Sequence, residues 1–417
     1  MRYIKRAIEP VLKKSSDTFK TVLVTGPRQV GKSTVLKKSF SGIPVVTFDD
    51  KFLLRIAKND PALFLKDNPP PVILDEVQYA PELFPYIKKI CDENDEYGRY
   101  YLTGSQQYNL MQNVSESLAG RAAIHELQGL SMREIFEVDL NRHYIPTDDY
   151  INARKKTHKP YGNIWQHIHR GSNPELQNQN IDWGTYWSGY LQTYLERDVS
   201  QLINLKDKMA FVSFMTAVAA RTGQMLNYSS IADEIGKTVA TVKEWMSVLA
   251  ASGLVYLLQP YSSSALNRAI KTPKIYFRDT GLCCYLTRWL TADALKVSAM
   301  NGNIFESFVV SEILKSFSNA GLDYRFSVFY YRGKDKVRAS GDETLKEREI
   351  DLIISEEGTL YPIEIKMTAT PSLSHTNAFD VLDLDKTKKR GKGSIICLSD
   401  NLVHLNENVL VVPIDYV

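Results

Sequence analysis

The sequence predicts an α/β protein in three parts: a parallel-sheet domain in residues 1–140, a helical middle in residues 141–290 and a second α/β domain in residues 295–417. Three observations support this division. A chain of 417 residues is too long for one ordinary core and corresponds to about three domains. In the first third, short apolar runs alternate with helical patterns, as in parallel sheets. In the last third, a long helical pattern precedes several successive strand patterns.

The composition is typical of a soluble globular protein, with 44% apolar and 24% charged residues. No window approaches the ~20 uncharged apolar residues that a membrane span needs, and no apolar signal region precedes the first strand. We therefore expect a cytoplasmic protein with no membrane partner. The four cysteines lack metal-ligand spacing and are expected to be buried free thiols. A net charge of +3 neither requires nor excludes nucleic acid as a partner.

The first strand pattern leads into a glycine loop. Residues Thr21–Thr25 favour a strand, and a helical pattern begins at Lys32. A G-x-x-x-x-G-K-S pattern between a strand and a helix is typical of a P-loop, whose backbone N–H groups and helix N-terminus bind phosphate. The sequence therefore predicts ATP and Mg²⁺ as cofactors, bound by a loop made of Gly26, Pro27, Arg28, Gln29, Val30, Gly31, Lys32, Ser33 and Thr34.

Two side chains of this loop have distinct expected roles. Lys32 should reach the β- and γ-phosphates and contribute to catalysis. Ser33 lies in the first turn of the helix, so its hydroxyl is expected to ligate Mg²⁺, whereas Thr34 should point away from the metal.

A second apolar strand, Val72–Asp75, ends in the carboxylates Asp75 and Glu76. Continuous apolar runs are typical of buried parallel strands, and an acid at the end of such a strand meets the metal side of the phosphate loop. This is a Walker B pattern. We expect Asp75 to hold Mg²⁺ through water and Glu76 to polarise the attacking water. The pair therefore predicts hydrolysis as well as binding.

The following strand pattern ends at Thr103 and Ser105, where a hydroxyl can lie between the water and the γ-phosphate and act as a sensor. Further along, Arg121 follows a short helical pattern. Its guanidinium either stabilises the phosphoryl transition state, in its own chain or in a neighbour, or forms an ordinary surface ion pair.

These motifs together resemble a known family. The segments are Gly26-Pro-Arg-Gln-Val-Gly-Lys-Ser, Leu74-Asp-Glu-Val-Gln78, Leu102-Thr-Gly-Ser105, Leu118-Ala-Gly-Arg121, Tyr194-Leu-Glu-Arg197-Asp198-Val and Tyr276-Phe-Arg-Asp279-Thr-Gly281-Leu. In this order they look like the prokaryotic AAA-type ATP-binding proteins that carry a C-terminal domain of unknown function. The resemblance covers nearly the whole chain and implies ATP binding. It also places Arg197 and Asp198 in a family motif, for which the sequence suggests no chemical role.

The middle third begins with a polar stretch, residues 142–180, which predicts an inserted or poorly packed connection. Its histidines lack a matching set of cysteines or carboxylates, so scattered surface histidines are favoured over a metal site. Apolar residues then recur at helical spacing from Trp183 to Leu195, which predicts a core helix.

A helix-turn-helix pattern follows. A capped helix over residues 227–236, a glycine turn, a helix over 239–251 and a strand from Gly253 have the order of a winged helix. Such a module either reads DNA or serves as a lid or protein contact. The second helix offers one basic residue, Lys243, so the contact role is favoured over base readout.

The last domain contains four residues with the pattern of a metal-dependent phosphodiesterase. Glu306 lies in the helical pattern, Asp351 begins one strand, and Glu364 and Lys366 share one face of the next. Carboxylates with a lysine on adjacent strands can hold Mg²⁺ and activate water beside a phosphodiester. The arrangement is similar to the PD-(D/E)xK nuclease superfamily, whose restriction-endonuclease-like fold has the order α-β-β-β-α-β. Glu306, Asp351 and Glu364 would be metal ligands and Lys366 catalytic. An active nuclease, a non-catalytic nuclease-like domain and a chance match all remain open.

The sequence thus predicts a Mg²⁺-dependent ATPase whose nucleotide state regulates a C-terminal, nuclease-like domain that interacts with nucleic acid, with DNA as a candidate partner. The alternative is an ATP-dependent switch or scaffold that binds protein partners or a second copy of itself.

Overall fold

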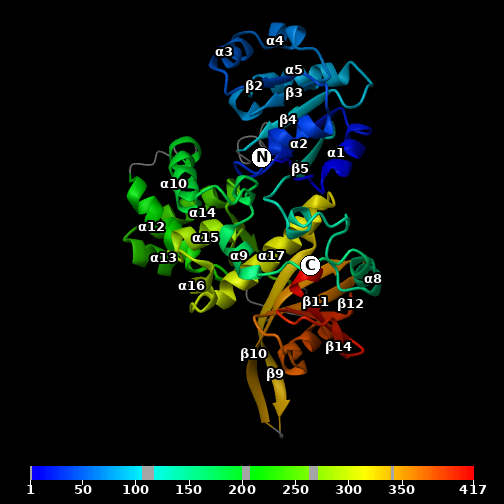
Figure 1. The fold of residues 1–417 in the computed structure, drawn as a ribbon, viewed down its shortest axis with the longest axis vertical. Helices are drawn as coiled ribbons and strands as arrows, with labels where there is room; N and C mark the ends of the chain where they lie inside the picture. The colour runs from blue at the N-terminus through cyan, green and yellow to red at the C-terminus, as the bar shows by residue number, and fades with distance from the viewer. Residues whose placement is uncertain (1, 106–116, 200–206, 263–270, 340–341) are drawn as a thin grey trace.

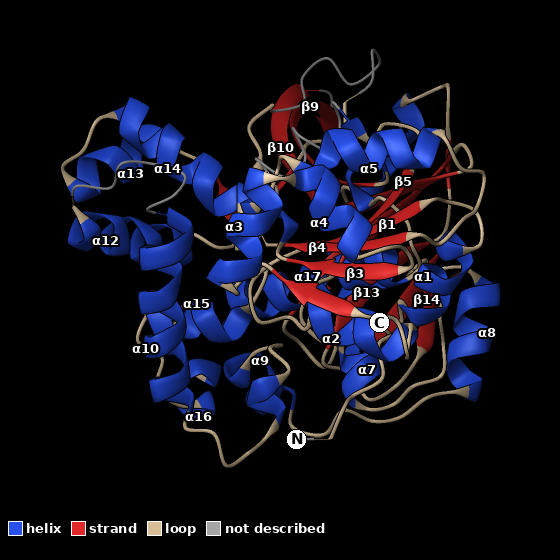
Figure 2. Ribbon diagram, turned by 90° about the horizontal axis from the view of Figure 1, so that it is seen from above, coloured by secondary structure: helices blue, strands red, loops and turns tan. Residues whose placement is uncertain are grey.

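The computed structural model describes residues 2–105, 117–199, 207–262, 271–339 and 342–417. The chain forms three regions (Figure 1): an N-terminal domain at the top of the view, a group of middle helices at the left, and a C-terminal sheet at the bottom. Helix α17 (Asn301–Asn319) runs between them. Seen from above, helices α10 and α12 to α16 lie to one side of the two larger sheets (Figure 2).

The N-terminal domain is built on a five-stranded sheet with the order β2-β3-β4-β1-β5, and all of its neighbouring strands are parallel. Its elements are α1 (Glu9–Ser16), β1 (Thr21–Thr25), α2 (Lys32–Ser39), β2 (Val45–Thr47), α3 (Lys51–Asn59), α4 (Pro61–Asp67), β3 (Val72–Asp75), α5 (Leu83–Asp92), β4 (Tyr100–Gly104), β5 (Ala122–Glu126) and α7 (Met132–Ile135).

Burial and capping explain these elements. Strands β1, β3 and β4 are buried at every position, as continuous apolar runs in a parallel sheet should be. Helix α3 begins where the Asp50 carboxylate accepts from two backbone N–H groups, and α7 begins with a capping box between Ser131 and Glu134. Because β4 lies between β1 and β3, its C-terminal end is adjacent to the ends of both.

The middle region corrects one expectation. Residues 142–180 are not a poorly packed connection, because they form α8 (Asp148–Lys156) and α9 (Ile164–Arg170). Tyr144, Tyr150 and Trp165 are buried in a core shared with the C-terminal domain. The prediction failed because the stretch is polar overall, while its few aromatic side chains pack against residues more than a hundred positions later.

The rest of the middle region contains the expected helices. Trp187, Tyr190 and Tyr194 are buried along α10 (Trp183–Tyr194), so this is the core helix that the spacing predicted. The helix-turn-helix elements are also present, with Gly236 in the left-handed region between α13 and α14 (φ 64°); the winged-helix interpretation stays a prediction. The elements are α12 (Lys208–Ala219), β6 (Gln224–Met225), α13 (Tyr228–Ile235), α14 (Val239–Ala251), β7 (Val255–Leu258), β8 (Lys274–Phe277), α15 (Thr280–Leu286) and α16 (Ala292–Lys296).

The C-terminal domain packs α17 against a mixed sheet with the order β14-β15-β13-β11-β10-β9, and β12 pairs with β11. Strands β9, β10 and β11 are antiparallel, whereas β11, β13 and β15 are parallel. The strands are β9 (Val328–Ala339), β10 (Asp342–Glu356), β11 (Thr359–Lys366), β12 (Lys389–Arg390), β13 (Gly393–Cys397), β14 (Val403–Asn406) and β15 (Val409–Pro413).

One helix differs from the nuclease-like order. In segment 367–392, which the structure describes throughout, two short 3₁₀ helices replace the α-helix expected between the third and fourth strands. Leu373–Thr376 has no buried residue, and only the second, Phe379–Leu384, contributes apolar side chains to a core.

Two composition-based expectations can be compared with the structure. All four cysteines are buried and free, as expected. Within the described ranges, none of the helices combines the length and the apolar character that crossing a membrane would require.

Candidate functional site

The phosphate loop joins β1 to α2 and depends on its two glycines. Gly26 has φ 138°, and a Cβ on it would lie 2.0 Å from the Leu127 carbonyl oxygen. Gly31 is the left-handed N-cap of α2 (φ 92°). Both positions therefore require glycine. Between them, Gln29 also has a positive φ of 61°, which is uncommon for a residue with a side chain.

Lys32 lies across its own loop. Its Nζ donates to the carbonyl oxygens of Pro27 at 2.8 Å and Gly26 at 3.1 Å, and the residue is 5% exposed. The ammonium is therefore held at the centre of the loop, where a bound phosphate group would accept from it.

The two residues expected to hold Mg²⁺ here, Ser33 and Asp75, meet the expected sensor Thr103 at one carboxylate oxygen. The hydroxyls of Ser33, from α2, and Thr103, from β4, each donate to Oδ1 of Asp75 at 2.5 Å. Asp75 is 8% exposed at the end of β3. Hard oxygen ligands from the loop helix and from the Walker B strand are the donor set that Mg²⁺ uses beside phosphates, so these residues fit the metal.

Glu76 follows directly and adopts a left-handed conformation (φ 57°). Its backbone N–H donates to Thr103 Oγ1 at 3.0 Å, and its Oε2 accepts from Gln78 Nε2 at 2.5 Å and Ser105 Oγ at 3.3 Å. A non-glycine residue with positive φ is held by its surroundings, here by hydrogen bonds from β4 and from the turn after β3. Thr103 and Ser105 thus contact the two acids, and their sensor role stays a prediction.

A cavity of about 490 Å³ opens beside the loop. Gln29, Gly31, Thr34 and Lys38 line one side, and Pro174 and Glu175 of the middle region line another. The N-terminal segment Arg2–Ile4 borders it as well, and Lys38 Nζ lies 5.7 Å from the centroid of the Tyr3 ring. This cavity is adjacent to the phosphate loop and has the volume of a small-molecule site.

Arg121 is not brought to this site. Its carbonyl oxygen accepts from Thr21, the first residue of β1, so Arg121 lies at the edge of the sheet opposite the phosphate loop. Its side chain forms an ion pair with Asp92, and the hydrogen bond from Arg121 lowers the pKa of that carboxyl. Within its own chain, the surface ion pair is therefore the arrangement that forms.

The four C-terminal residues do come together. Lys366 Nζ lies 2.5 Å from Glu364 Oε1 and 3.4 Å from Asp351 Oδ2. Glu306 of α17 joins them through Lys274, a residue of β8 that the sequence had not suggested. Lys274 Nζ lies 3.2 Å from Glu306 Oε1, 2.6 Å from Glu349 Oε1 and 3.8 Å from Asp351 Oδ1.

This cluster does not have the geometry of a metal centre. Among the residues that the structure describes, no group of three or more His, Cys, Asp and Glu side chains is arranged to hold a metal ion. The expected ligands Glu306 and Asp351 surround an ammonium instead. Burial, and then the charge of Asp351, raise the pKa of Glu364 to about 8. Burial also raises the pKa of Glu306, and Lys274 opposes that shift.

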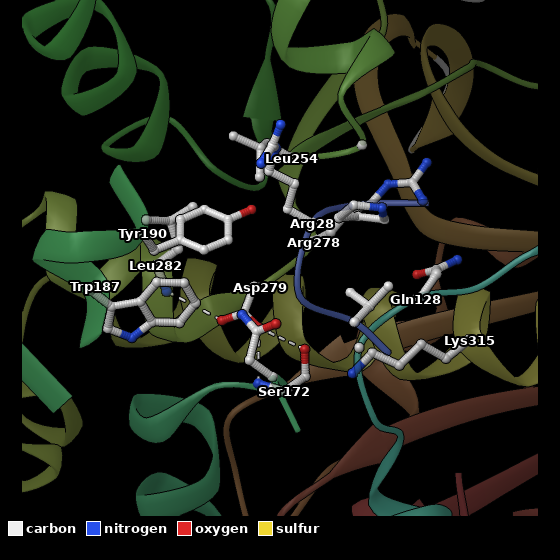
Figure 3. A pocket seen from close by; sticks show the side chains of 15 residues that line it. Arg28, Gln128, Ser172, Trp187, Tyr190, Leu254, Arg278, Asp279, Leu282 and Lys315 are labelled. Atoms are coloured by element: carbon white, nitrogen blue, oxygen red, sulfur yellow. Dashed lines mark hydrogen bonds between the residues drawn. The ribbon is translucent and has the colours of Figure 1, made fainter. Parts of the chain in front are cut away.

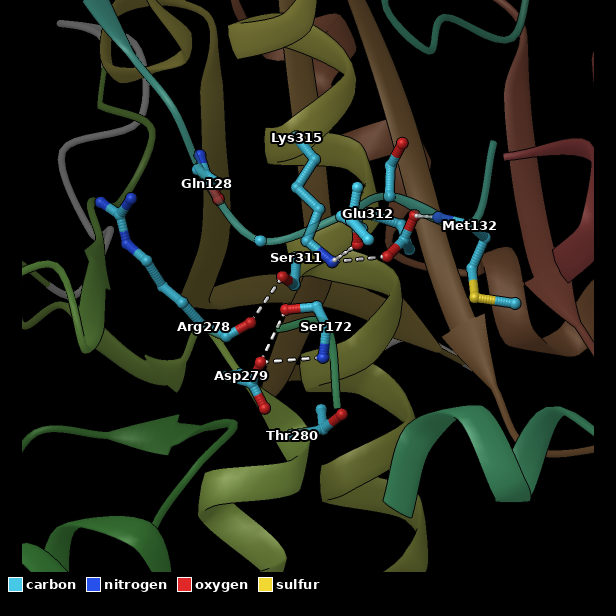
Figure 4. A network of polar contacts seen from close by, with 12 residues as sticks. Gln128, Met132, Ser172, Arg278, Asp279, Thr280, Ser311, Glu312 and Lys315 are labelled. Carbon is cyan, nitrogen blue, oxygen red and sulfur yellow. Dashed lines mark hydrogen bonds and ion pairs between the residues drawn. The ribbon is translucent and has the colours of Figure 1, made fainter. Parts of the chain in front are cut away.

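The family-motif residues Arg278 and Asp279 lie where the three regions meet. Asp279 caps α15 and accepts from the backbone and hydroxyl of Ser172 at 2.9 and 2.6 Å. Arg278 pairs with Glu126 of the N-terminal domain, and its carbonyl oxygen accepts from Ser311 of α17. Figure 4 shows the bonds from Ser172 to Asp279 and the bond from Ser311 of α17 to the Arg278 carbonyl oxygen. The motif that contains Arg278 and Asp279 therefore joins the regions. The side chains of Arg197 and Asp198 lie outside the part that the structure describes.

The same junction touches the phosphate loop. A cavity of about 30 Å³ has Pro27, Arg28 and Val30 of the loop on one wall. Trp187, Tyr190 and Leu254 of the middle region and Lys315 of α17 complete it, as Figure 3 shows. Next to it, Tyr186 Oη donates to Gln29 Oε1 at 2.7 Å.

The histidines of the middle stretch serve packing. His143 pairs with Glu356 and His158 with Asp415, while His169 stacks on Trp183 and lies 2.9 Å from the Trp289 carbonyl oxygen. Sequence reasoning missed Lys274, Glu349 and Tyr186, since each acquires its partner only through tertiary contacts. The Lys274 side chain is only 4% exposed. A single lysine in a strand pattern does not reveal from the sequence that its side chain is buried.

Three family models match the chain in succession. Residues 18–136 match an AAA domain, residues 161–293 a domain of unknown function (DUF8612), and residues 301–417 a domain of unknown function (DUF4143). Two relatives are the uncharacterized proteins Mb2031c of Mycobacterium bovis and Rv2008c of Mycobacterium tuberculosis. Each is 28% identical over 401 residues, which cover 95% of this chain and 80% of the relative.

Solved structures give weaker likenesses. The Walker-type ATPase PABY2304 of Pyrococcus abyssi is 16% identical, with a TM-score of 0.40 over 67% of this chain and 94% of that one. The STAND protein PH0952 of Pyrococcus horikoshii, which has a tetratricopeptide repeat sensor, is 11% identical, with a TM-score of 0.26 over 76% and 47%. Both scores are low, so the assignment rests on the family model and on the site. From the match over residues 18–136 and the geometry of the phosphate loop, the N-terminal part of the chain is a P-loop domain of AAA-type ATPases.

Proposed function

We propose that the protein is a Mg²⁺-dependent ATPase that hydrolyses ATP at the phosphate loop. The observation that carries this proposal is the meeting of Ser33, Thr103 and Asp75 at one oxygen, with Glu76 beside it. Bound Mg²⁺ would neutralise the charge that develops on the phosphates. Lys32 would turn from its loop carbonyls to the β- and γ-phosphates. The nucleoside would lie in the cavity bordered by Tyr3 and Lys38.

Glu76 would accept the proton of the attacking water. Its bonds from Gln78 and Ser105 hold the carboxylate in one orientation at the end of β3. Thr103 would link the two acids, because its hydroxyl donates to Asp75 and accepts from the Glu76 backbone. A change at the metal would thereby be passed to the water-activating residue.

The test is ATP turnover by Glu76→Gln. Loss of a general base is expected to lower the rate by about 10²–10⁴-fold. Binding of a fluorescent ATP analogue should remain, because Glu76 is not expected to hold the phosphates. Glu82→Gln, an exposed acid six residues later, is the control and should keep the wild-type rate. A Glu76→Gln protein with wild-type turnover would refute the assigned base.

We further propose that the nucleotide state is transmitted to the C-terminal domain and regulates its interaction with DNA. Support comes from the contact of Tyr186 with Gln29 of the phosphate loop and from the convergence of Asp351, Glu364 and Lys366 on adjacent strands. The nuclease-like interpretation rests on that convergence, together with the order of α17 and strands β9 to β13.

The experiment incubates labelled single- and double-stranded DNA with the full chain and Mg²⁺ or Mn²⁺, with and without ATP. Cleavage or ATP-dependent retention on a filter, lost in Asp351→Ala, would support the DNA proposal. Salt dependence of the retention would identify phosphate contacts. If ATP is hydrolysed but DNA is neither cut nor retained, the switch or scaffold that binds protein partners becomes the preferred function.

A further inference from the structure

The acidic cluster of the C-terminal domain, defined as Glu306, Glu349, Asp351 and Glu364, encloses a cation that belongs to the chain itself. Lys274 Nζ is within 4 Å of carboxylate oxygens from three of these residues, at 2.6, 3.2 and 3.8 Å. Tyr276, two positions along the same strand, donates its hydroxyl to the same Glu306 oxygen at 2.6 Å. Strand β8 therefore supplies both a charge and a hydrogen bond to this cluster.

The lysine is fixed in place. Its side chain is 4% exposed, and the ring of Tyr330 lies 5.7 Å from Nζ. The backbone of Tyr330 in β9 exchanges hydrogen bonds with Gln259 and Tyr261, which follow β7. The Tyr330 hydroxyl also donates to the carbonyl oxygen of Thr272, just before β8. These bonds fasten the small sheet of β6, β8 and β7 to the C-terminal sheet, so the backbone that carries Lys274 is held against the acidic cluster.

The position of this ammonium matters because of the residues around it. Carboxylates on α17, β10 and β11 with a lysine on β11 form the arrangement in which a divalent cation would be expected, yet the described acids lack metal geometry. One oxygen, Oε2 of Glu364, is buried and has no hydrogen-bond partner, while Lys366 holds its Oε1. The cluster therefore contains a buried carboxylate oxygen without a hydrogen-bond partner, together with a monovalent cation among its acids.

We propose that Lys274 is a resident counter-ion that closes this cluster to divalent cations, and that the cluster binds a metal once the charge of Lys274 is removed. The inference rests on the proposed function in treating the cluster as the nuclease-like site. It adds that, in this arrangement of the domains, the middle region keeps that site free of metal.

The test is a Mn²⁺ titration of the full chain without nucleotide. Binding is measured by calorimetry and by the loss of the electron paramagnetic resonance signal of free Mn²⁺. Lys274→Met removes the charge with little change in length, and Lys274→Arg keeps the charge. Each protein is compared with its Asp351→Asn derivative, which subtracts any Mn²⁺ held by Ser33 and Asp75. If Lys274→Met does not fold, Lys274→Gln, which keeps an amide donor, gives the same comparison.

We expect no Asp351-dependent Mn²⁺ binding by the wild type or by Lys274→Arg. Lys274→Met should gain one such site, with affinity at least about tenfold above wild type, because a like charge no longer opposes the metal. Mn²⁺ should also raise the melting temperature of Lys274→Met more than that of its Asp351→Asn derivative, whereas the wild type and its Asp351→Asn derivative should respond alike. Folded Lys274→Met or Lys274→Gln without the extra site would overturn the proposal, as would a wild-type protein that binds Mn²⁺ through Asp351.

These outcomes are separate from failure of the proposed function. Mn²⁺ binding by Lys274→Met without DNA cleavage would support the counter-ion and argue against nuclease activity. ATP hydrolysis by Glu76→Gln tests the site at the phosphate loop. In the hydrogen bonds and ion pairs described, Lys274 does not contact that loop, so the two tests can fail independently.

Discussion

The two acidic sites of this protein use similar residues in opposite ways. At the phosphate loop, Asp75 is surrounded by hydroxyl donors from Ser33 and Thr103, which can rotate or exchange for a metal. In the C-terminal domain, Asp351 is surrounded by the ammonium groups of Lys274 and Lys366. Hydroxyls leave the negative charge of a carboxylate available, whereas lysines neutralise it. A carboxylate at the end of β3 thus accepts from neutral hydroxyls, whereas one inside β10 pairs with ammonium groups, which holds two domains together.

The largest expected effect concerns the lysine of the phosphate loop. Lys32→Ala should lower ATP hydrolysis by about 10²–10³-fold, because a preorganised charge is removed from the position of the phosphates. Lys37→Ala, an exposed change on the same helix, is the control. Turnover is measured at saturating ATP. Equal rates for the two variants would mean that the lysine of this site, like that of the other, serves structure.

The second prediction concerns stability at the other site. Asp351→Asn should lower the free energy of unfolding by about 2 kcal/mol, because two buried or half-buried ammonium groups lose a charged acceptor. Urea unfolding of the apo protein measures it. Asp383→Asn, which breaks an exposed pair with Arg390, should cost less than about 1 kcal/mol. If Asp351→Asn is as stable as the wild type, the contrast between catalysis and cohesion fails.

A third prediction uses pH. The pKa of Glu364 is raised from 4.5 to about 8, so the folded protein holds a proton that the unfolded chain releases in this interval. The contribution of Glu364 to stability should therefore be present below pH 4.5 and be lost as the pH rises toward 8. Glu364→Gln should flatten this part of the profile of unfolding free energy against pH. An unchanged slope would show that Lys366 already compensates the buried charge.

The smallest expected effect is at the contact between the domains. Tyr186→Phe removes the hydroxyl that donates to Gln29, an exposed hydrogen bond worth about 1 kcal/mol at most. ATP affinity should change by no more than about fivefold. If this hydrogen bond transmits the nucleotide state to the rest of the molecule, the difference in DNA retention with and without ATP should be smaller for Tyr186→Phe than for the wild type. Tyr285→Phe is a matched control within the same region, since its ring packs on Trp183 away from the loop.

The sequence predicted the N-terminal domain well because its signals are local. A strand, a glycine loop and a helix that are adjacent in the chain place Lys32 and Ser33, and apolar runs place Asp75 and Thr103 at one edge of a sheet. The domain boundaries and the roles of individual side chains remain predictions. Arg121 was left open between two roles, although it directly precedes β5, and in a parallel sheet the residue before a strand lies at the edge opposite the phosphate loop.

The C-terminal cluster could be predicted only in part. Glu364 and Lys366 share a face by strand periodicity, and Asp351 lies on the neighbouring strand. Lys274 comes from a different region, about 30 residues before Glu306, and no periodic pattern links the two. Residues 142–180 were misjudged for the same reason, because Tyr144 and Trp165 find their partners in the last third of the chain.

The burial of α17 has a consequence for synthesis on the ribosome. The segment around Gln128–Met132 bonds to Ser318, Lys315 and Glu312 of that helix, and the aromatic residues after it share a core with the last strands. At translation rates of about 5–20 residues per second, this segment waits roughly 10–40 seconds for its partners to emerge. The phosphate loop can form early. Its junction with the rest of the molecule is completed only near the end of translation, so the two events are separated in time.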